Sequence, residues 1–161
     1  MATHIRLFFL RHSEAVEKEQ WKGAERQRPL SEAGERNTIK AAERFASIGL
    51  HLDLILSSPL TRALHTAELM GGAFGKPLVP IVDERLAPGF DEDALDDILD
   101  EYGGKESILL VGHEPDLGLI AGSLSACARI ELKKGALALV DLDADTGEGR
   151  LLWLIPQNLM I

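Results

Sequence analysis

The sequence predicts an α/β sandwich with a mostly parallel central sheet. Short apolar runs of strand length alternate along the chain with segments whose apolar residues recur at helical spacing. Strands that alternate with helices form a parallel sheet whose faces the helices cover. A chain of 161 residues is long enough to bury one sizeable core. We therefore expect a single domain over residues 1–161.

The expected elements follow one another without repeats or low-complexity linkers. In order they are a strand over 5–10, a loop with a helical turn over 14–30, a helix from Ser31 to Gly49, a strand over 53–57, a helix opened by Ser58-Pro59 and ended by Gly71-Gly72, a strand over 78–82, a loop over 83–90, a helix over 91–102, a strand over 107–111, a helix from Pro115 to Leu124, and a hairpin of strands over 136–142 and 150–155.

Local signals mark the boundaries of these elements. Ser31 can cap the first helix, and Gly49 can end it. Pro59 and Pro115 stand near the first turns of later helices, where proline removes no helical hydrogen bond. Pro80 indicates an edge strand, because proline cannot donate to a neighbouring strand.

Apolar residues recur at helical spacing through the first helix. They are Ile39, Ala42 and Ala46, together with Ala41, Phe45 and Ile48.

Composition argues against several kinds of function. The net charge of −9 disfavours a general nucleic-acid binder and an anionic membrane surface. No apolar segment approaches the roughly 20 residues of a membrane helix. The first residues lack the pattern of a signal peptide, so we expect a cytoplasmic protein. Cys127 is the single cysteine, which excludes an intramolecular disulfide; we expect it to be a small buried apolar residue.

Residues that can hold an anion follow three of the predicted strands. They are Arg11-His12, the pair Ser58 and Arg62, and His113. Open α/β sheets bind ligands at the carboxyl ends of their strands, and the amino end of a helix favours an anion. From the residues alone, His12 is either a structural histidine or a nucleophile that attacks phosphorus. Arg62 is either an exposed helix residue or an anion ligand.

In this order along the chain, these residues resemble the histidine phosphatase (phosphoglycerate mutase-like) superfamily. The segments that carry the resemblance are Leu10-Arg11-His12-Ser13-Glu14-Ala15, Arg28-Pro29-Leu30-Ser31-Glu32-Ala33-Gly34, Ser57-Ser58-Pro59-Leu60-Thr61-Arg62-Ala63 with Thr66-Ala67, and Val111-Gly112-His113-Glu114-Pro115. The short chain, together with Glu84-Arg85-Leu86-Ala87-Pro88-Gly89 and Gly135-Ala136-Leu137-Ala138-Leu139, is similar to the SixA-type phosphohistidine phosphatases. The resemblance covers nearly the whole chain.

The resemblance implies a three-layer α/β/α sandwich in which His12 and His113 follow neighbouring strands and face one another. His12 is then the nucleophile, Arg11 and Arg62 bind the phosphoryl oxygens, and His113 completes the pocket. Ser58 is a further candidate phosphate ligand. This chemistry is electrostatic and positional, and it needs no metal or other cofactor. His12 must present an unprotonated nitrogen, so we expect its other nitrogen to donate to a backbone carbonyl.

Two glutamates are candidates for the proton donor to the leaving group. In mutase-like relatives the donor follows the third strand, where Glu84 lies. Other relatives use an acid directly after the second histidine, where Glu114 stands. Either residue can instead be a solvated loop carboxylate. The chain also departs from the family pattern at Ser13, where the family generally has glycine, whose backbone freedom serine lacks.

The resemblance implies a phosphatase that forms a transient phospho-His12. We expect phosphohistidine on a partner protein as the substrate, because the stretch after Leu86 is too brief to form a lid over the pocket. One alternative is a small-molecule phosphomonoesterase of the same superfamily. Another is a phosphate-binding regulatory module without catalysis.

Overall fold

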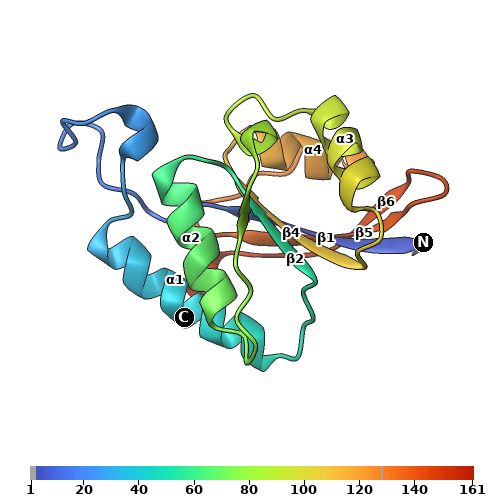
Figure 1. The fold of residues 1–161 in the computed structure, drawn as a ribbon, viewed down its shortest axis with the longest axis horizontal. Helices are drawn as coiled ribbons and strands as arrows, with labels where there is room; N and C mark the ends of the chain where they lie inside the picture. The colour runs from blue at the N-terminus through green and yellow to red at the C-terminus, as the bar shows by residue number, and fades with distance from the viewer. Residues whose placement is uncertain (1–2, 128) are drawn as a thin grey trace.

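The computed structural model describes residues 3–127 and 129–161, and within them six strands form one sheet in the order β3-β2-β4-β1-β5-β6 (Figure 1). The elements are β1 (His4–Arg11), η1 (Glu25–Gln27), α1 (Glu32–Ser47), β2 (Leu54–Ser57), α2 (Thr61–Gly72), β3 (Ile81–Val82), η2 (Glu84–Leu86), α3 (Glu92–Tyr102), β4 (Ser107–Gly112), α4 (Asp116–Leu124), β5 (Leu137–Asp143), β6 (Gly149–Ile155) and η3 (Gln157–Leu159), where η marks a 3₁₀ turn. Of the domain expected over 1–161, residues 1, 2 and 128 lie outside the described residues.

The sheet is mostly parallel, as predicted. β1 pairs with β4, β4 with β2, and β2 with β3, all in parallel. The predicted hairpin is β5 and β6, and β5 runs antiparallel to β1. The implied neighbourhood of β1 and β4 is confirmed, so the residues that follow these two strands emerge side by side.

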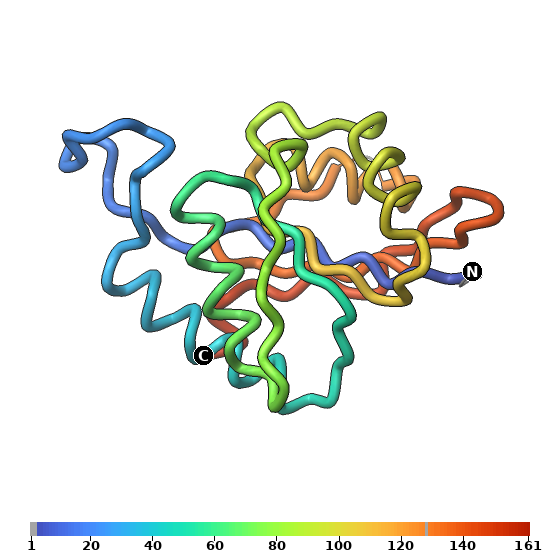
Figure 2. The backbone as a smooth tube through the Cα atoms, in the orientation of Figure 1, coloured from blue at the N-terminus to red at the C-terminus, as the bar shows by residue number. Residues whose placement is uncertain are grey.

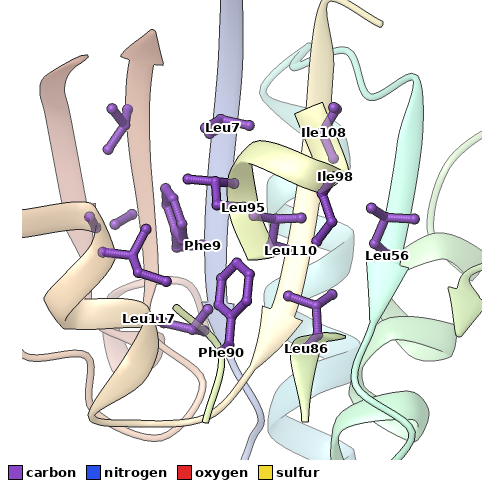
Figure 3. Close-up of a cluster of buried hydrophobic side chains, with 14 of the residues drawn as sticks. Leu7, Phe9, Leu56, Leu86, Phe90, Leu95, Ile98, Ile108, Leu110 and Leu117 are labelled. Atoms are coloured by element: carbon purple, nitrogen blue, oxygen red, sulfur yellow. The ribbon is translucent and has the colours of Figure 1, made fainter. Parts of the chain in front are cut away.

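Helices cover both faces of the sheet and make three layers (Figure 1). Successive side chains of a strand point to opposite faces. In β1, Leu7 and Phe9 therefore pack with α3 and α4, as Figure 3 shows for this cluster, while Phe8 and Leu10 pack with α1 and α2. All four side chains are at most 2% exposed, which explains why β1 is an unbroken apolar run.

The predicted boundaries of α1 are confirmed. The Ser31 hydroxyl accepts a hydrogen bond from the Gly34 backbone N–H, and Gly49 follows the helix with a φ of 74°. Two of the apolar residues with helical spacing lie outside its buried side. Ile39 is 40% exposed, and Ile48 lies beyond the last helical residue and is 57% exposed. The residues that α1 buries are Gly34, Thr38, Ala41, Ala42 and Phe45.

Two further elements differ from their predicted limits. α2 begins at Thr61 rather than at Pro59, because Leu60 still has extended backbone angles. β3 is confirmed at the sheet edge but contains only Ile81–Val82, since Pro80 cannot join the ladder.

Cys127 is exposed, which corrects its predicted burial. The helix before it, α4, ends at Leu124, and the chain then turns through Ala126 with a φ of 52°. Cys127 therefore lies beyond the end of the helix, at the protein surface.

The segment between β1 and α1 extends away from the sheet as an arm, which Figure 2 shows in blue. An antiparallel bridge between Ala15 and Leu30 closes its base. The arm, residues 16–28, contains the helical turn η1, in agreement with the predicted loop. Within the described part of the chain, no helix is long and apolar enough to cross a membrane.

Candidate active site

The register of β1 and β4 brings His12 and His113 together. Arg11 is opposite Gly112 in the ladder, and the His12 N–H donates to the Gly112 carbonyl at 3.0 Å. On the other side of β1, the Arg11 N–H donates to the Ala136 carbonyl at 3.2 Å. The two imidazole rings are consequently 5.2 Å apart between centroids, at an angle of 54°. The implied face-to-face pair is therefore present.

The hydrogen bonds of His12 define its tautomer. Nδ1 lies 2.7 Å from the Ser13 carbonyl oxygen, which can only accept, so Nδ1 carries the proton. Nε2 keeps its lone pair and accepts from Arg62 Nε at 3.3 Å. This arrangement is the one expected of a nucleophilic histidine whose second nitrogen is fixed by the backbone.

Burial keeps both rings neutral. The side chains of the two residues are enclosed, with His12 7% and His113 5% exposed. The pKa of His12 is lowered to about 3, chiefly by burial; the hydrogen bond to Ser13 opposes the change, and the charges of His113, Arg62 and Arg11 add to it. Burial, followed by the charges of Arg62 and Arg11, lowers the pKa of His113 to about 4. At neutral pH, Nε2 of His12 therefore carries no proton, and its lone pair accepts the hydrogen bond from Arg62 Nε.

The Ser58 hydroxyl contacts the His113 ring. Because Ser57 pairs with Val111, Ser58 lies beside the end of β4, and its Oγ is 2.7 Å from His113 Nε2. The same hydroxyl accepts the Leu60 N–H at 3.2 Å. The side chain is fully buried, and its hydroxyl contacts His113; its role as a phosphate ligand stays a prediction.

The Arg11 guanidinium is held by a hydrogen bond to the backbone. Its Nη1 donates to the Leu132 carbonyl at 3.0 Å. Among the residues that the structure describes, Arg11 Nε is buried and has no hydrogen-bond partner. A buried donor without a partner is costly, and Arg11 is one of the residues that line the cavity.

Arg62 reaches the site from the first turn of α2 and is 6% exposed. Nη1 donates to the Glu25 carbonyl at 3.2 Å, and Nη2 lies 3.4 Å from Glu25 Oε1. Arg28 binds the same carboxylate through Nε and Nη2 at 3.0–3.3 Å. Burial and the charges of Arg28 and Arg11 lower the pKa of Arg62, whereas Glu25 opposes this change.

The sequence analysis missed Glu25 as part of the site and used Arg28 only as part of a motif. The arm has no periodicity that orients its side chains. An acidic residue three positions before an arginine, in a stretch rich in cations, is the signal that could have indicated an ion pair.

These residues surround a cavity of about 380 Å³ that opens to solvent at the carboxyl ends of β1 and β4. The lining consists of Arg11, His12, Ala15, Glu17, Lys18, Glu19, Glu25, Arg28, Arg62, Pro88, His113, Glu114 and Lys134. Four of its charged or imidazole groups were predicted from the strand ends, namely Arg11, His12, Arg62 and His113.

The two candidate proton donors are placed differently. Glu114 lines the cavity, and its carboxylate accepts the N–H groups of Gly118 and Leu132 at 2.8 and 3.3 Å. Burial raises the pKa of Glu114, while those two hydrogen bonds oppose the change. Glu84 is 72% exposed, pairs with Arg26 at 3.3 Å and does not line the cavity. The geometry therefore favours Glu114 over Glu84.

Ser13 fits its position without backbone strain. Within the described residues, Ala126 is the one non-glycine residue with a positive φ, so Ser13 needs no glycine-like conformation. Its N–H donates to Thr66 Oγ1 at 3.1 Å, and its hydroxyl accepts from Gln157 Nε2 at 2.9 Å. The serine thus ties the loop after β1 to α2 and to the C-terminal turn.

The fold and the cavity define a class of α/β protein built for phosphoryl transfer. A neutral imidazole nitrogen faces a solvent-open cavity between two guanidinium groups, which can bind the oxygens of a phosphoryl group. A sequence family described as the histidine phosphatase superfamily (branch 1) matches residues 7–87. An uncharacterised protein of Picosynechococcus is 38% identical over 116 residues, which are 71% of this chain and 69% of the relative. The chain belongs to the histidine phosphatase superfamily, and it is a phosphatase of that superfamily.

Solved structures show the same fold. The protein histidine phosphatase SixA, complexed with tungstate, has a TM-score of 0.86 at 24% identity, with 98% of this chain and 100% of that chain covered. The α-ribazole phosphatase from Shigella flexneri has a TM-score of 0.74 at 18% identity and covers 95% of this chain and 97% of its own. A mycobacterial glucosyl-3-phosphoglycerate phosphatase has a TM-score of 0.71 at 18% identity, with 92% and 97% covered. The fold is therefore SixA-like, and proteins with different substrates share it.

Proposed function

We propose that this protein removes the phosphoryl group from phosphohistidine on a partner protein through a transient phospho-His12. The observation that carries the proposal is the neutral His12, which lines an open cavity and whose unprotonated Nε2 contacts Arg62. Between β3 and α3, which the structure describes throughout, the chain forms only the turn η2 and a short loop, so this segment adds no lid to the cavity that the arm borders. An open entrance suits a histidine side chain that is attached to a protein surface.

In the proposed first step, the Nε2 lone pair of His12 forms a bond to phosphorus. The bond between phosphorus and the substrate imidazole breaks, and its electron pair stays on the imidazole nitrogen, which takes up a proton. Glu114 is the candidate donor of that proton, because it lines the cavity. Arg11 and Arg62 would balance the charge of the phosphoryl oxygens, and His113, held by Ser58, would donate a hydrogen bond from its other ring nitrogen.

In the second step, water attacks the phosphorus of phospho-His12. The new P–O bond forms as the P–Nε2 bond breaks, with its electron pair returning to Nε2; one proton of the water passes to the Glu114 carboxylate, which regains its acid form, and inorganic phosphate leaves with the other. His12 returns to its neutral form, with the proton on Nδ1 held by the Ser13 carbonyl. Each of these roles is served by side chains of the chain itself.

The test follows acid-labile phosphate on the protein while a phosphohistidine-carrying protein is hydrolysed. We expect turnover with a transient label in the wild type and neither in His12→Asn. Turnover that is undiminished in the variant would contradict nucleophilic catalysis by His12.

A small phosphomonoester is the second candidate substrate. The α-ribazole phosphatase and the glucosyl-3-phosphoglycerate phosphatase, which share this fold, are named for such substrates. Hydrolysis of small esters combined with no activity on phosphohistidine proteins would favour this alternative.

A further inference from the structure

We infer that Glu25 is a positioning residue that sets the orientation of Arg62 toward the phosphoryl group. This inference rests on the proposed phosphoryl transfer at His12. Glu25 lies on the arm, far in sequence from α2, yet it contacts Arg62 through both its backbone carbonyl and its carboxylate. Arg62 is almost fully buried, so each of its donors needs a fixed partner.

The geometry divides the guanidinium into two edges. Both terminal nitrogens, Nη1 and Nη2, contact Glu25, so the outer edge is occupied by the arm. Nε lies on the side edge and donates to His12 Nε2. A guanidinium is planar and rigid, so fixing the outer edge also fixes the direction of the side edge. The remaining donor on the side edge, from Nη2, is thereby held beside the nucleophile, where a phosphoryl oxygen would bind.

Arg28 completes the arrangement. It holds the Glu25 carboxylate through two nitrogens and donates from Nη1 to the Val16 carbonyl. The hydrogen bond from Arg28 and the charges of Arg28 and Arg62 lower the pKa of Glu25, so its carboxylate stays ionised. The Glu25 carboxylate of the arm thus contacts both Arg28 and Arg62. Its negative charge offsets the repulsion between the two guanidinium groups and holds Arg62 in place.

Binding of orthovanadate separates positioning from a simple change of charge. Glu25→Gln removes one negative charge from the cavity, so electrostatic attraction alone would make vanadate bind more tightly. Loss of the fixed orientation of Arg62 has the opposite sign, and we expect binding to weaken about tenfold. Glu68→Gln, at an exposed position of α2, is the matched control for charge and should bind like the wild type.

Glu25→Gln is then combined with Arg62→Ala. If Glu25 acts through Arg62, Glu25→Gln should have no further effect on vanadate affinity in that background. Tighter or unchanged binding by Glu25→Gln, or an equal loss in both backgrounds, would overturn the inference. Thermal unfolding confirms that each variant is folded. Because this assay needs no turnover, it remains decisive even if the wild type fails to hydrolyse phosphohistidine proteins, a result that would contradict only the proposed substrate.

Discussion

Acidification from pH 7 to pH 5 should destabilise this protein through His12 and His113. Their folded pKa values of about 3 and about 4 lie below the ordinary value of 6.5. The unfolded chain therefore binds protons that the folded protein does not. As a result, the free energy of unfolding decreases as the pH decreases. The loss begins as the pH drops through 6.5 and is complete near the folded pKa of each histidine.

The magnitude follows from these values. At pH 5 an unfolded histidine is almost fully protonated, whereas both folded rings are still neutral. Each histidine then costs about 2 kcal/mol relative to pH 7. The raised pKa of Glu114 acts in the opposite direction, because there the folded protein binds the additional proton. Asp53 and Asp83 have lowered pKa values and contribute at lower pH.

Urea unfolding at the two pH values measures this effect. The free energy lost between pH 7 and pH 5 should be smaller by about 2 kcal/mol in His12→Asn and in His113→Asn than in the wild type. His65→Asn, at the partly exposed histidine of α2, should lose as much as the wild type. If all four proteins lose the same amount, burial does not keep the two rings neutral and the reasoning is refuted.

Two further predictions concern contacts around the site. Ser58→Ala removes the partner of His113 Nε2. The phosphatase rate should fall about tenfold in a kinetic assay, and the free energy of unfolding in urea should fall by about 1 kcal/mol. An unchanged rate would show that the His113 ring needs no support from Ser58. Gly34→Ala would place a Cβ 2.0 Å from the Glu14 carbonyl oxygen and should cost about 2 kcal/mol or more in urea unfolding. Gly72→Ala, with open space around its Cβ on α2, should instead stabilise the protein by about 0.5 kcal/mol, and equal effects at the two glycines would contradict the packing argument.

The sequence predicts the elements well where the physical signal is local. The run Leu7–Leu10 is a strand buried on both faces, and Ser31 caps its helix, because both properties depend on nearby residues. Strand pairing is not local. That β1 lies beside β4 came from the resemblance, since apolar periodicity does not say which strand pairs with which.

The site was predicted as far as strand ends could indicate it. His12 and His113 follow buried strands, and their meeting follows from the ladder. The contact between Ser58 and His113 was not predicted, because it depends on the pairing of β2 with β4, which the local sequence does not show. Glu25 was missed because a loop fixes its side chains by long-range contacts, which the sequence around them does not show.

The hydrogen bonds on both sides of β1 have a consequence for hydrogen exchange. The Arg11 amide donates to Ala136 and the His12 amide to Gly112, at the carboxyl end of a central strand, and both should exchange only when the whole protein unfolds. The arm is joined to the rest of the chain mainly near the Ala15–Leu30 bridge and at Arg62, so its amides should exchange through local opening. We therefore expect hydrogen exchange to separate the nucleophile from the segment that supports its arginine, with fast exchange in the arm and slow exchange at His12.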